Sequence, residues 1–203
     1  KSNIQSKFIR GLRVTDEKII NIVESVLIDF NNDIVDSLRK FGTDAVSIHT
    51  KKNNIIKVTP ESKELGFVGI PNEIDNNLIK KILNKKQVPI ISPLGLGNDN
   101  HPYNINGDTA AGAIAKSLKS RRLLLMTNVE GVLDKDKKLI DEISSSEILK
   151  MIEDNTITEG MIPKINTCLD AVNNGVTAVG IIDGRKQHSI FCLLYTSPSP
   201  RDT

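Results

Sequence analysis

Apolar residues recur at helical spacing after Thr15-Asp16, a dipeptide suited to capping a helix. The pattern predicts one long amphipathic helix that ends before Gly42, and its apolar face would be made by Ile19, Ile20, Val23, Val26, Leu27, Phe30, Ile34, Val35 and Leu38. A second helix is predicted over residues 73–85. It leads directly into residues 88–92, which are apolar on both faces. A strand of that kind belongs inside a sheet that helices cover.

Shorter β-rich segments lie between these two helices. Residues 45–49 and 55–59 flank a polar stretch from Lys51 to Asn54, which predicts a hairpin or ribbon. Residues 66–70 form a further extended segment, and we expect Pro71 to end it.

The second half of the chain repeats the alternation of strand and helix. Helices are predicted over residues 108–118, 146–153 and 161–173, and strands over 103–106, 123–127 and 176–182. This order predicts an α/β fold, a three-layer αβα sandwich with a mainly parallel central sheet. In such folds, ligands bind at the carboxyl ends of the strands.

Charge and composition exclude some classes of function. The net charge is +2, and 27 basic residues are scattered among 25 acidic ones, so no basic stripe for nucleic acid is present. Aromatic residues make up 3% of the chain, which disfavours a surface for stacking bases. No apolar run is long enough to cross a bilayer. Cys168 and Cys192 are far apart and lack metal-ligand spacing, so we expect free thiols, no metal site and a cytoplasmic protein.

Two segments place polar residues after predicted strands. The run from Asn104 to Ala111 has two asparagines at a strand end and then Asp108, which we expect to cap a small-residue helix. A capping role alone would also explain that carboxylate. The run from Thr127 to Val132 again ends a strand with polar residues and a glycine, although a plain turn has the same composition.

Two further candidates are cations beside helix starts. Lys164 would lie in the first turn of a helix, which is unfavourable for a cation unless the lysine and the helix amides face a phosphate. Arg13 precedes a predicted cap and could bind a carboxylate through both arms of its guanidinium. For each residue taken singly, an exposed solvated side chain is the simpler interpretation.

Other motifs predict no chemistry. His49, His101 and His188 are dispersed and lack the partners of a metal or hydrolase site, so we interpret them as surface or loop residues. The stretch from Lys135 to Lys138 is typical of a solvated turn. The chain has no GxxxxGK[ST] loop, which excludes the P-loop nucleotide folds.

Taken in order, the motifs resemble those of the acetylglutamate kinases, within the amino acid kinase superfamily. The matching runs are Gly11-Leu12-Arg13-Val14-Thr15-Asp16, Asn104-Ile105-Asn106-Gly107-Asp108, Thr127-Asn128-Val129-Glu130-Gly131-Val132, Gly160-Met161-Ile162-Pro163-Lys164 and Ile182-Asp183-Gly184-Arg185. The resemblance covers about residues 8–190. It implies transfer of the ATP γ-phosphate, with Mg²⁺, to the γ-carboxylate of N-acetyl-L-glutamate in arginine biosynthesis.

The resemblance also implies roles for individual residues. Arg13 and Asn104 would bind the amino-acid substrate, Lys164 would stabilise the transferring phosphoryl group, and Asp108 would orient catalytic lysines. The ATP pocket would be lined by Asn128, Val129, Glu130, Gly131, Val132, Leu133, Thr156, Ile157 and Thr158. Residues 1–106 would form the amino-acid lobe and residues 107–190 the ATP lobe.

Both ends of the chain differ from the family pattern. A lysine with paired glycines and a second glycine-rich loop would precede Lys1, and a last strand would follow Ile190. We interpret residues 191–203 as a non-native tail, with a flexible native tail as the alternative. We therefore expect this polypeptide to be inactive and poorly folded by itself, although the complete protein would be an active homo-oligomer.

Three alternatives to this function stay open on sequence alone. The chain could belong to another amino acid kinase, such as glutamate 5-kinase, aspartokinase or carbamate kinase. It could act as an arginine sensor or as a platform for a nitrogen-regulatory protein. Finally, the motifs could be coincidental in a plain α/β binding module.

Overall fold

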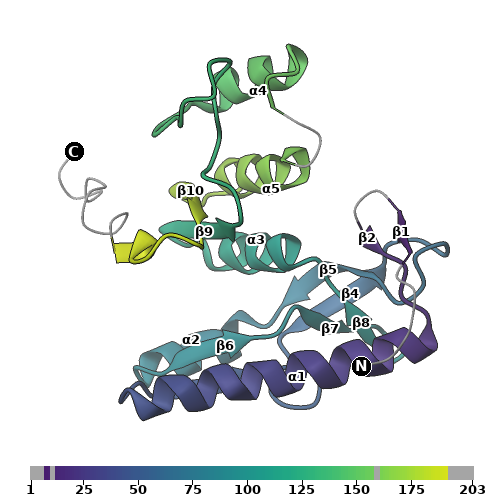
Figure 1. Cartoon of the computed structure of the whole chain (residues 1–203). Coiled ribbons are helices and arrows are strands. Elements are labelled where there is room, and N and C mark those ends of the chain that lie inside the picture. The colour runs from purple at the N-terminus through teal and green to yellow at the C-terminus, as the bar shows by residue number, and fades with distance from the viewer. Residues whose placement is uncertain (1–6, 10–11, 158–160, 192–203) are drawn as a thin grey trace. The chain divides into compact units, whose positions relative to one another are not determined.

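The computed structural model describes residues 7–9, 12–157 and 161–191, and the chain divides into two compact units, residues 1–118 and 119–203. Figure 1 labels the elements of both units. The first unit contains β1 (Phe8–Ile9), β2 (Leu12–Arg13), α1 (Glu17–Lys40), β3 (Ala45–Ile48), β4 (Ile56–Pro60), β5 (Gly69–Ile74), α2 (Asn76–Asn84), β6 (Val88–Ile91), β7 (Leu94–Leu96), β8 (Pro102–Asn104) and α3 (Gly107–Leu118).

Helix α1 confirms the long amphipathic helix that the sequence predicts (Figure 1). The Asp16 carboxylate accepts a hydrogen bond from the Ile19 N–H at 2.8 Å and so caps the first turn. Its buried face also includes two polar residues, Glu24 and Asn31. The Glu24 carboxylate accepts from the Thr50 hydroxyl at 2.6 Å, and the Asn31 amide donates to the Ile90 carbonyl at 2.8 Å. These bonds compensate for the burial of polar groups.

Strands β3 and β6 pair in parallel, with Ala45 opposite Val88 and Ile48 opposite Ile91. The predicted hairpin between residues 45–49 and 55–59 is therefore wrong. The chain does reverse locally, because His49 and Lys52 exchange backbone hydrogen bonds of 2.9 and 3.0 Å. After this reversal the chain enters β4, which belongs to a different sheet. Parallel pairing joins segments that a long crossover separates, so local sequence does not reveal it.

The other sheet of the first unit has the strand order β5-β4-β7-β8. Strand β4 is antiparallel to β5 and parallel to β7, and β7 is antiparallel to β8. The prediction that Pro71 ends the extended segment is wrong, because β5 continues through it to Ile74. Strand β5 is at the edge of this sheet, where a residue without an N–H is tolerated.

An apolar core stabilises the first unit. Side chains from β3, β4, α2, β8 and α3 meet in it, and its buried members are Ile48, Ile55, Ile56, Val58, Ile79, Ile82, Tyr103, Ile105 and Ala110. Each fully buried isoleucine contributes about 1.5–3 kcal/mol relative to an exposed one. Phe67 is partly buried and packs against this core.

The second unit consists of β9 (Arg122–Thr127), α4 (Ser145–Glu153), α5 (Ile162–Asn173) and β10 (Ala178–Asp183) among its described residues. Strands β9 and β10 are parallel, with Arg122 opposite Ala178 and Thr127 opposite Asp183. A separate core forms around Ile148, Ile157 and Ile165. The elements predicted here are confirmed, with ends that differ by one or two residues.

No helix in the described part of the chain is both long enough and apolar enough to cross a membrane. The Cys168 side chain is buried. Cys192 lies outside the described residues, and so does the rest of the segment that we interpret as a non-native tail, apart from Phe191. The Phe191 ring contacts the His188 ring edge-on, with centroids 6.3 Å apart.

Candidate functional site

Arg13 ends the short strand β2 and is exposed, and its guanidinium carbon lies 5.4 Å from the centre of the Phe8 ring. The following residues anchor it to the fold. The Thr15 hydroxyl donates to the Arg13 carbonyl at 2.9 Å, and Thr15 is fully buried. The Phe67 N–H in turn donates to the Thr15 carbonyl at 2.7 Å. Gly11, which begins the family motif, lies outside the described residues.

Asn104 is also hydrogen-bonded to Phe67. Its backbone N–H donates to the Phe67 carbonyl at 2.9 Å, where β8 ends. Phe67 therefore hydrogen-bonds on one side to the segment that follows Arg13 and on the other to Asn104. The structure joins the two predicted substrate-binding segments through this one residue.

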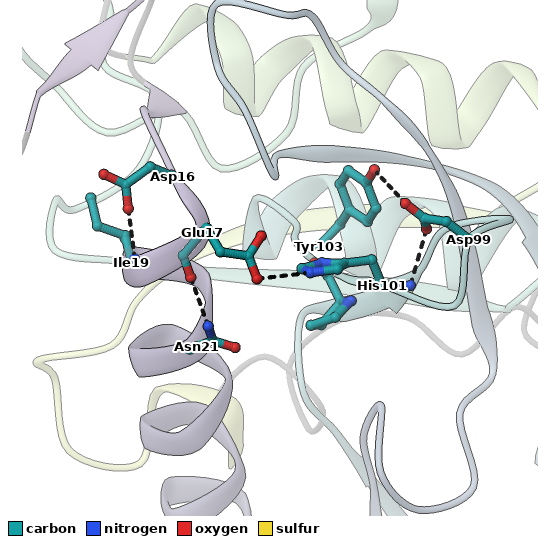
Figure 2. Close-up of polar contacts among 8 residues, drawn as sticks. Asp16, Glu17, Ile19, Asn21, Asp99, His101 and Tyr103 are labelled. Atoms are coloured by element: carbon teal, nitrogen blue, oxygen red, sulfur yellow. Dashed lines mark hydrogen bonds and ion pairs between the residues drawn. The ribbon is translucent and has the colours of Figure 1, made fainter.

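An aromatic cluster surrounds the same segment. The Phe67 and His101 rings are stacked, with centroids 4.3 Å apart, and the Tyr103 ring is tilted against Phe67 at 5.5 Å. The Asp99 carboxylate accepts from the backbone N–H of His101 at 3.0 Å and from the Tyr103 hydroxyl at 3.5 Å. Figure 2 shows Glu17, from the first turn of α1, pointing at the His101 ring from the other side.

The interpretation of the histidines as surface or loop residues is wrong for His49, but His101 does lie in a loop, the one before β8, where it is half-buried. His49 is buried, and that burial, together with Lys52 and Lys51, lowers its pKa against the opposing effect of Glu24. Burial also tends to lower the pKa of His101, but the Pro102 carbonyl, Glu17 and Asp99 outweigh it, so the net shift is upward. His188 is exposed, as predicted.

Asp108 lies within the first turn of α3, but the residue that caps this helix is Asn106. The Asn106 side-chain oxygen accepts from the backbone N–H groups of Asp108 and Thr109 at 3.0 and 3.2 Å. The prediction that the Asp108 carboxylate is the cap is therefore wrong, because an asparagine two residues earlier already occupies the capping position. Asp108 is half-buried and belongs to the first unit.

In the second unit, polar groups gather where the parallel strands β9 and β10 end. The Gly184 N–H donates to the Thr127 carbonyl at 2.8 Å and joins the two strand ends. Arg185 donates to both oxygens of the buried Asp183 carboxylate, at 2.9 and 2.8 Å. These bonds and the Arg185 N–H lower the pKa of Asp183 to about 2. Glu130, from the predicted ATP segment, adds a smaller electrostatic contribution to the raised pKa of Arg185, after the main effect of Asp183.

A small hairpin follows the first ATP segment. Leu133 and Leu139 form an antiparallel bridge, and Gly131, with φ of +143°, precedes it. The turn around Lys135 is exposed, as predicted, and the Lys135 ammonium also pairs with Asp154 at 2.8 Å. That ion pair and hydrogen bonds from Thr156 hold the pKa of Asp154 at about 2.

The two predicted ATP segments therefore approach each other. Val132 packs on the core that contains Ile157, and the Lys135–Asp154 pair connects the hairpin to the residue just before the Asn155–Ile157 stretch. Thr158, the last residue of the second segment, lies outside the described residues. Lys164 lies in the first turn of α5, as predicted, beside the buried Ile165.

The structure thus places Arg13, Asn104 and Asp108 in the first unit, and Lys164 with the ATP segments in the second. Sequence reasoning missed Phe67, His101 and Glu17. Among the described residues, no group of three or more His, Cys, Asp or Glu side chains could hold a metal ion.

A model of the amino acid kinase family matches residues 1–183 of this chain, which includes all of these segments except the turn that begins at Gly184. The chain belongs to the amino acid kinase family. The α/β fold with parallel strands is that of this family, and the resemblance noted from the motifs is confirmed.

The chain is similar in sequence to acetylglutamate kinases from several bacteria. An acetylglutamate kinase from Pelagibacter ubique is 54% identical over 188 residues, which cover 93% of this chain and 65% of that protein. An acetylglutamate kinase from Brucella abortus (strain S19) is 44% identical over 210 residues, which cover 97% and 71%. The solved structure of smu.665 from Streptococcus mutans UA159 is 32% identical, with a TM-score of 0.81, over 89% of this chain and 74% of that one.

Proposed function

We propose that the protein containing this chain is an acetylglutamate kinase, which transfers the γ-phosphate of ATP to the γ-carboxylate of N-acetyl-L-glutamate in arginine biosynthesis. The observation that supports it most is the 54% identity to an acetylglutamate kinase along nearly the whole chain. This chain spans 65% of the length of that relative, so the proposal concerns the activity of a longer protein.

Arg13 and Asn104 would bind the amino-acid substrate. The guanidinium of Arg13 is exposed at a strand end and can bind a carboxylate through two parallel hydrogen bonds. Among the described residues, no hydrogen bond of the Asn104 side chain is present, so its amide is available to a polar group of the substrate. The shared attachment to Phe67 supports a common role, because it sets the register between the two segments.

The reaction would need no general base. The acceptor carboxylate has a solution pKa of about 4.3 and is ionised at neutral pH. The barrier is largely electrostatic, since two anions must be held in line while charge spreads over the transferring phosphoryl oxygens. Lys164 would supply positive charge near those oxygens, and the N-terminal amides of α5 would add to it. Asp108 would orient the ammonium groups of the catalytic lysines.

The ATP pocket would form at the carboxyl ends of β9 and β10, from residues 128–133 and 156–158. In α/β folds ligands bind at this edge of a parallel sheet. The Lys135–Asp154 pair supports the assignment, because it keeps the two segments together. Mg²⁺ would be bound through the ATP phosphates, as it commonly is in phosphoryl-transfer enzymes.

The proposal also covers the oligomeric state, the effectors and the cellular location of the protein. We infer a cytoplasmic homo-oligomer, as the resemblance to the acetylglutamate kinases implies for a biosynthetic enzyme of this family. Arginine or a nitrogen-regulatory protein would act as an effector. Titration of the purified protein with arginine, followed by activity and by size measurement, tests effector binding and assembly together.

A panel of phosphoryl acceptors tests the proposed activity. Purified protein containing this chain is incubated with MgATP and hydroxylamine, which traps acyl phosphates as hydroxamates. We expect hydroxamate with N-acetyl-L-glutamate, and at most a trace with L-glutamate, L-aspartate or carbamate. Turnover of one of the other acceptors instead would assign the protein to a different amino acid kinase. Absence of turnover with every acceptor would contradict the proposal.

A further inference from the structure

Each ring nitrogen of His101 has a hydrogen-bond acceptor, and Figure 2 shows the contact with Glu17. Its Nδ1 lies 3.2 Å from the Pro102 carbonyl oxygen, and its Nε2 lies 3.1 Å from a Glu17 carboxylate oxygen. A neutral imidazole has only one N–H, so it can donate to only one of these oxygens. The imidazolium has two and satisfies both. The geometry therefore favours the protonated ring.

The charged groups around the ring have the same effect. Within the described residues, the charges that act on His101 are Glu17 on α1 and Asp99 in its own loop, and both are acidic. The ion pair between Glu17 and His101 also joins residues that are far apart in the chain. It holds the loop before β8 against the first turn of α1, and we call this contact the clip.

The face of the His101 ring contacts the residue that joins the two halves of the candidate substrate site. It stacks on Phe67 with centroids 4.3 Å apart and an angle of 23° between the rings. The Phe67 backbone donates to Thr15 and accepts from Asn104, at 2.7 and 2.9 Å. The ring stacking therefore acts on the same residue whose backbone joins the Arg13 and Asn104 segments.

We propose that His101 is a positioning residue for the amino-acid substrate: its protonated ring, clipped by Glu17 and stacked on Phe67, keeps the Arg13 and Asn104 segments in register. The inference rests on the proposed function, because it assigns those segments to N-acetyl-L-glutamate. In this role His101 would contact neither ATP nor the reacting atoms.

The proposal predicts a pH dependence of defined sign. Because folding raises the pKa of His101 above its ordinary value of 6.5, the clip is complete below that pH and weakens as the pH rises through the folded value. Both carboxylates of N-acetyl-L-glutamate stay ionised throughout this range. Affinity for this substrate should therefore fall with rising pH, whereas affinity for MgATP should not follow the same curve.

Three variants test the inference in the protein that contains this chain. His101→Gln removes the titrating group and keeps a neutral donor. Glu17→Gln removes the charge of the partner and keeps its shape. Glu73→Gln is the control, because the Glu73 side chain is as exposed as that of Glu17, at 63%, and pairs with Lys57, whose side chain is more exposed (58%) than that of His101 (29%).

At saturating MgATP and about pH 6, we expect His101→Gln and Glu17→Gln to raise the KM for N-acetyl-L-glutamate about threefold to fivefold, the range for one partly exposed ion pair. Turnover and the KM for MgATP should stay near wild type. The KM of His101→Gln should be almost independent of pH between about 6 and 8.5, whereas that of the wild type should rise.

Three results would overturn the inference. In the first, His101→Gln keeps the pH dependence of the wild-type KM for N-acetyl-L-glutamate. In the second, the KM values for N-acetyl-L-glutamate and for MgATP rise equally, which would indicate general loosening of the fold. In the third, Glu73→Gln reproduces the effect of Glu17→Gln, so the contact between Glu17 and His101 has no special role. Failure of the proposed function is distinct from these outcomes, since the wild-type protein itself would then show no turnover with N-acetyl-L-glutamate.

Discussion

Gly66 and Thr15 are packed so closely that only a glycine fits. Gly66 has φ of +66°, and a Cβ built on it would lie 2.4 Å from the Thr15 carbonyl oxygen. The same oxygen accepts the hydrogen bond from Phe67. The backbone joint between the Arg13 segment and the Asn104 strand therefore depends on the absence of a side chain at residue 66.

Gly66→Ala should destabilise the first unit. The left-handed backbone is unfavourable for alanine, and the clash with Thr15 is with backbone and cannot be relieved by a rotamer change, so we expect a loss of more than about 2 kcal/mol in the free energy of unfolding. Chemical denaturation measures it. Gly107→Ala is the control, since a Cβ there meets nothing within 4 Å and φ is not positive. Equal stability of the two variants would show that the joint tolerates movement.

Arg13 and Lys164 should affect different kinetic constants. Arg13→Ala should mainly raise the KM for N-acetyl-L-glutamate, because it removes binding that the ground state and transition state share. Lys164→Ala should mainly lower kcat, because its charge would act on the transferring phosphoryl group. Steady-state kinetics with each substrate varied separately measures both. Lys18→Ala, an exposed cation on α1, should change neither constant. The reverse pattern would mean that the two roles are misassigned.

Lys135→Gln should weaken ATP binding without affecting the acceptor. It removes the ion pair with Asp154 that connects the hairpin after residues 128–133 to the stretch that includes Thr156 and Ile157. Because the pair is partly exposed, the KM for MgATP should rise only about twofold to threefold. Lys138→Gln, in the same exposed turn, is the control. An unchanged KM for MgATP in Lys135→Gln would argue against a shared pocket.

Arg185→Gln should make the second unit more sensitive to acid. In the wild type the pKa of Asp183 is about 2, so its ionised form stabilises the fold above its ordinary pKa, near pH 4, and this contribution is lost as the pH falls through about 2. Without Arg185 the buried carboxylate should protonate at a higher pH. Circular dichroism during titration from about pH 7 to pH 2 should show earlier unfolding. Lys137→Gln should leave the curve unchanged, and a curve for Arg185→Gln that overlays the wild type would disprove the expected coupling.

Local sequence patterns predicted the helices and strands whose residues follow a clear apolar period or run. Helix α1 follows from its apolar period and the Asp16 cap, and the strands that end at Ile91 and Thr127 follow from apolar runs. Strand β7 was missed because it has only three residues, the middle of which is Gly95. The pairing of β3 with β6 rather than β4 depends on contacts between distant segments, which no local window contains.

The candidate site shows the same limit. Arg13, Asn104 and Lys164 could be selected because each lies beside a recognisable strand end or helix start. His101 could not, because its ring partner Glu17 is 84 residues away and Phe67 belongs to yet another segment. Asn106 was passed over as the cap of α3 because Asp108 is an equally good capping residue type.

The central claim is that N-acetyl-L-glutamate binds in the first unit, at Arg13 and Asn104. A ¹⁵N NMR titration of the protein with this compound, following the Asn104 side-chain amide and the Arg13 Nε–H, tests it most directly. We predict that both signals shift together along one saturation curve, and that Arg13→Ala abolishes the shift at Asn104. Saturable shifts confined to residues 119–191, or no shift at either side chain, would contradict the account.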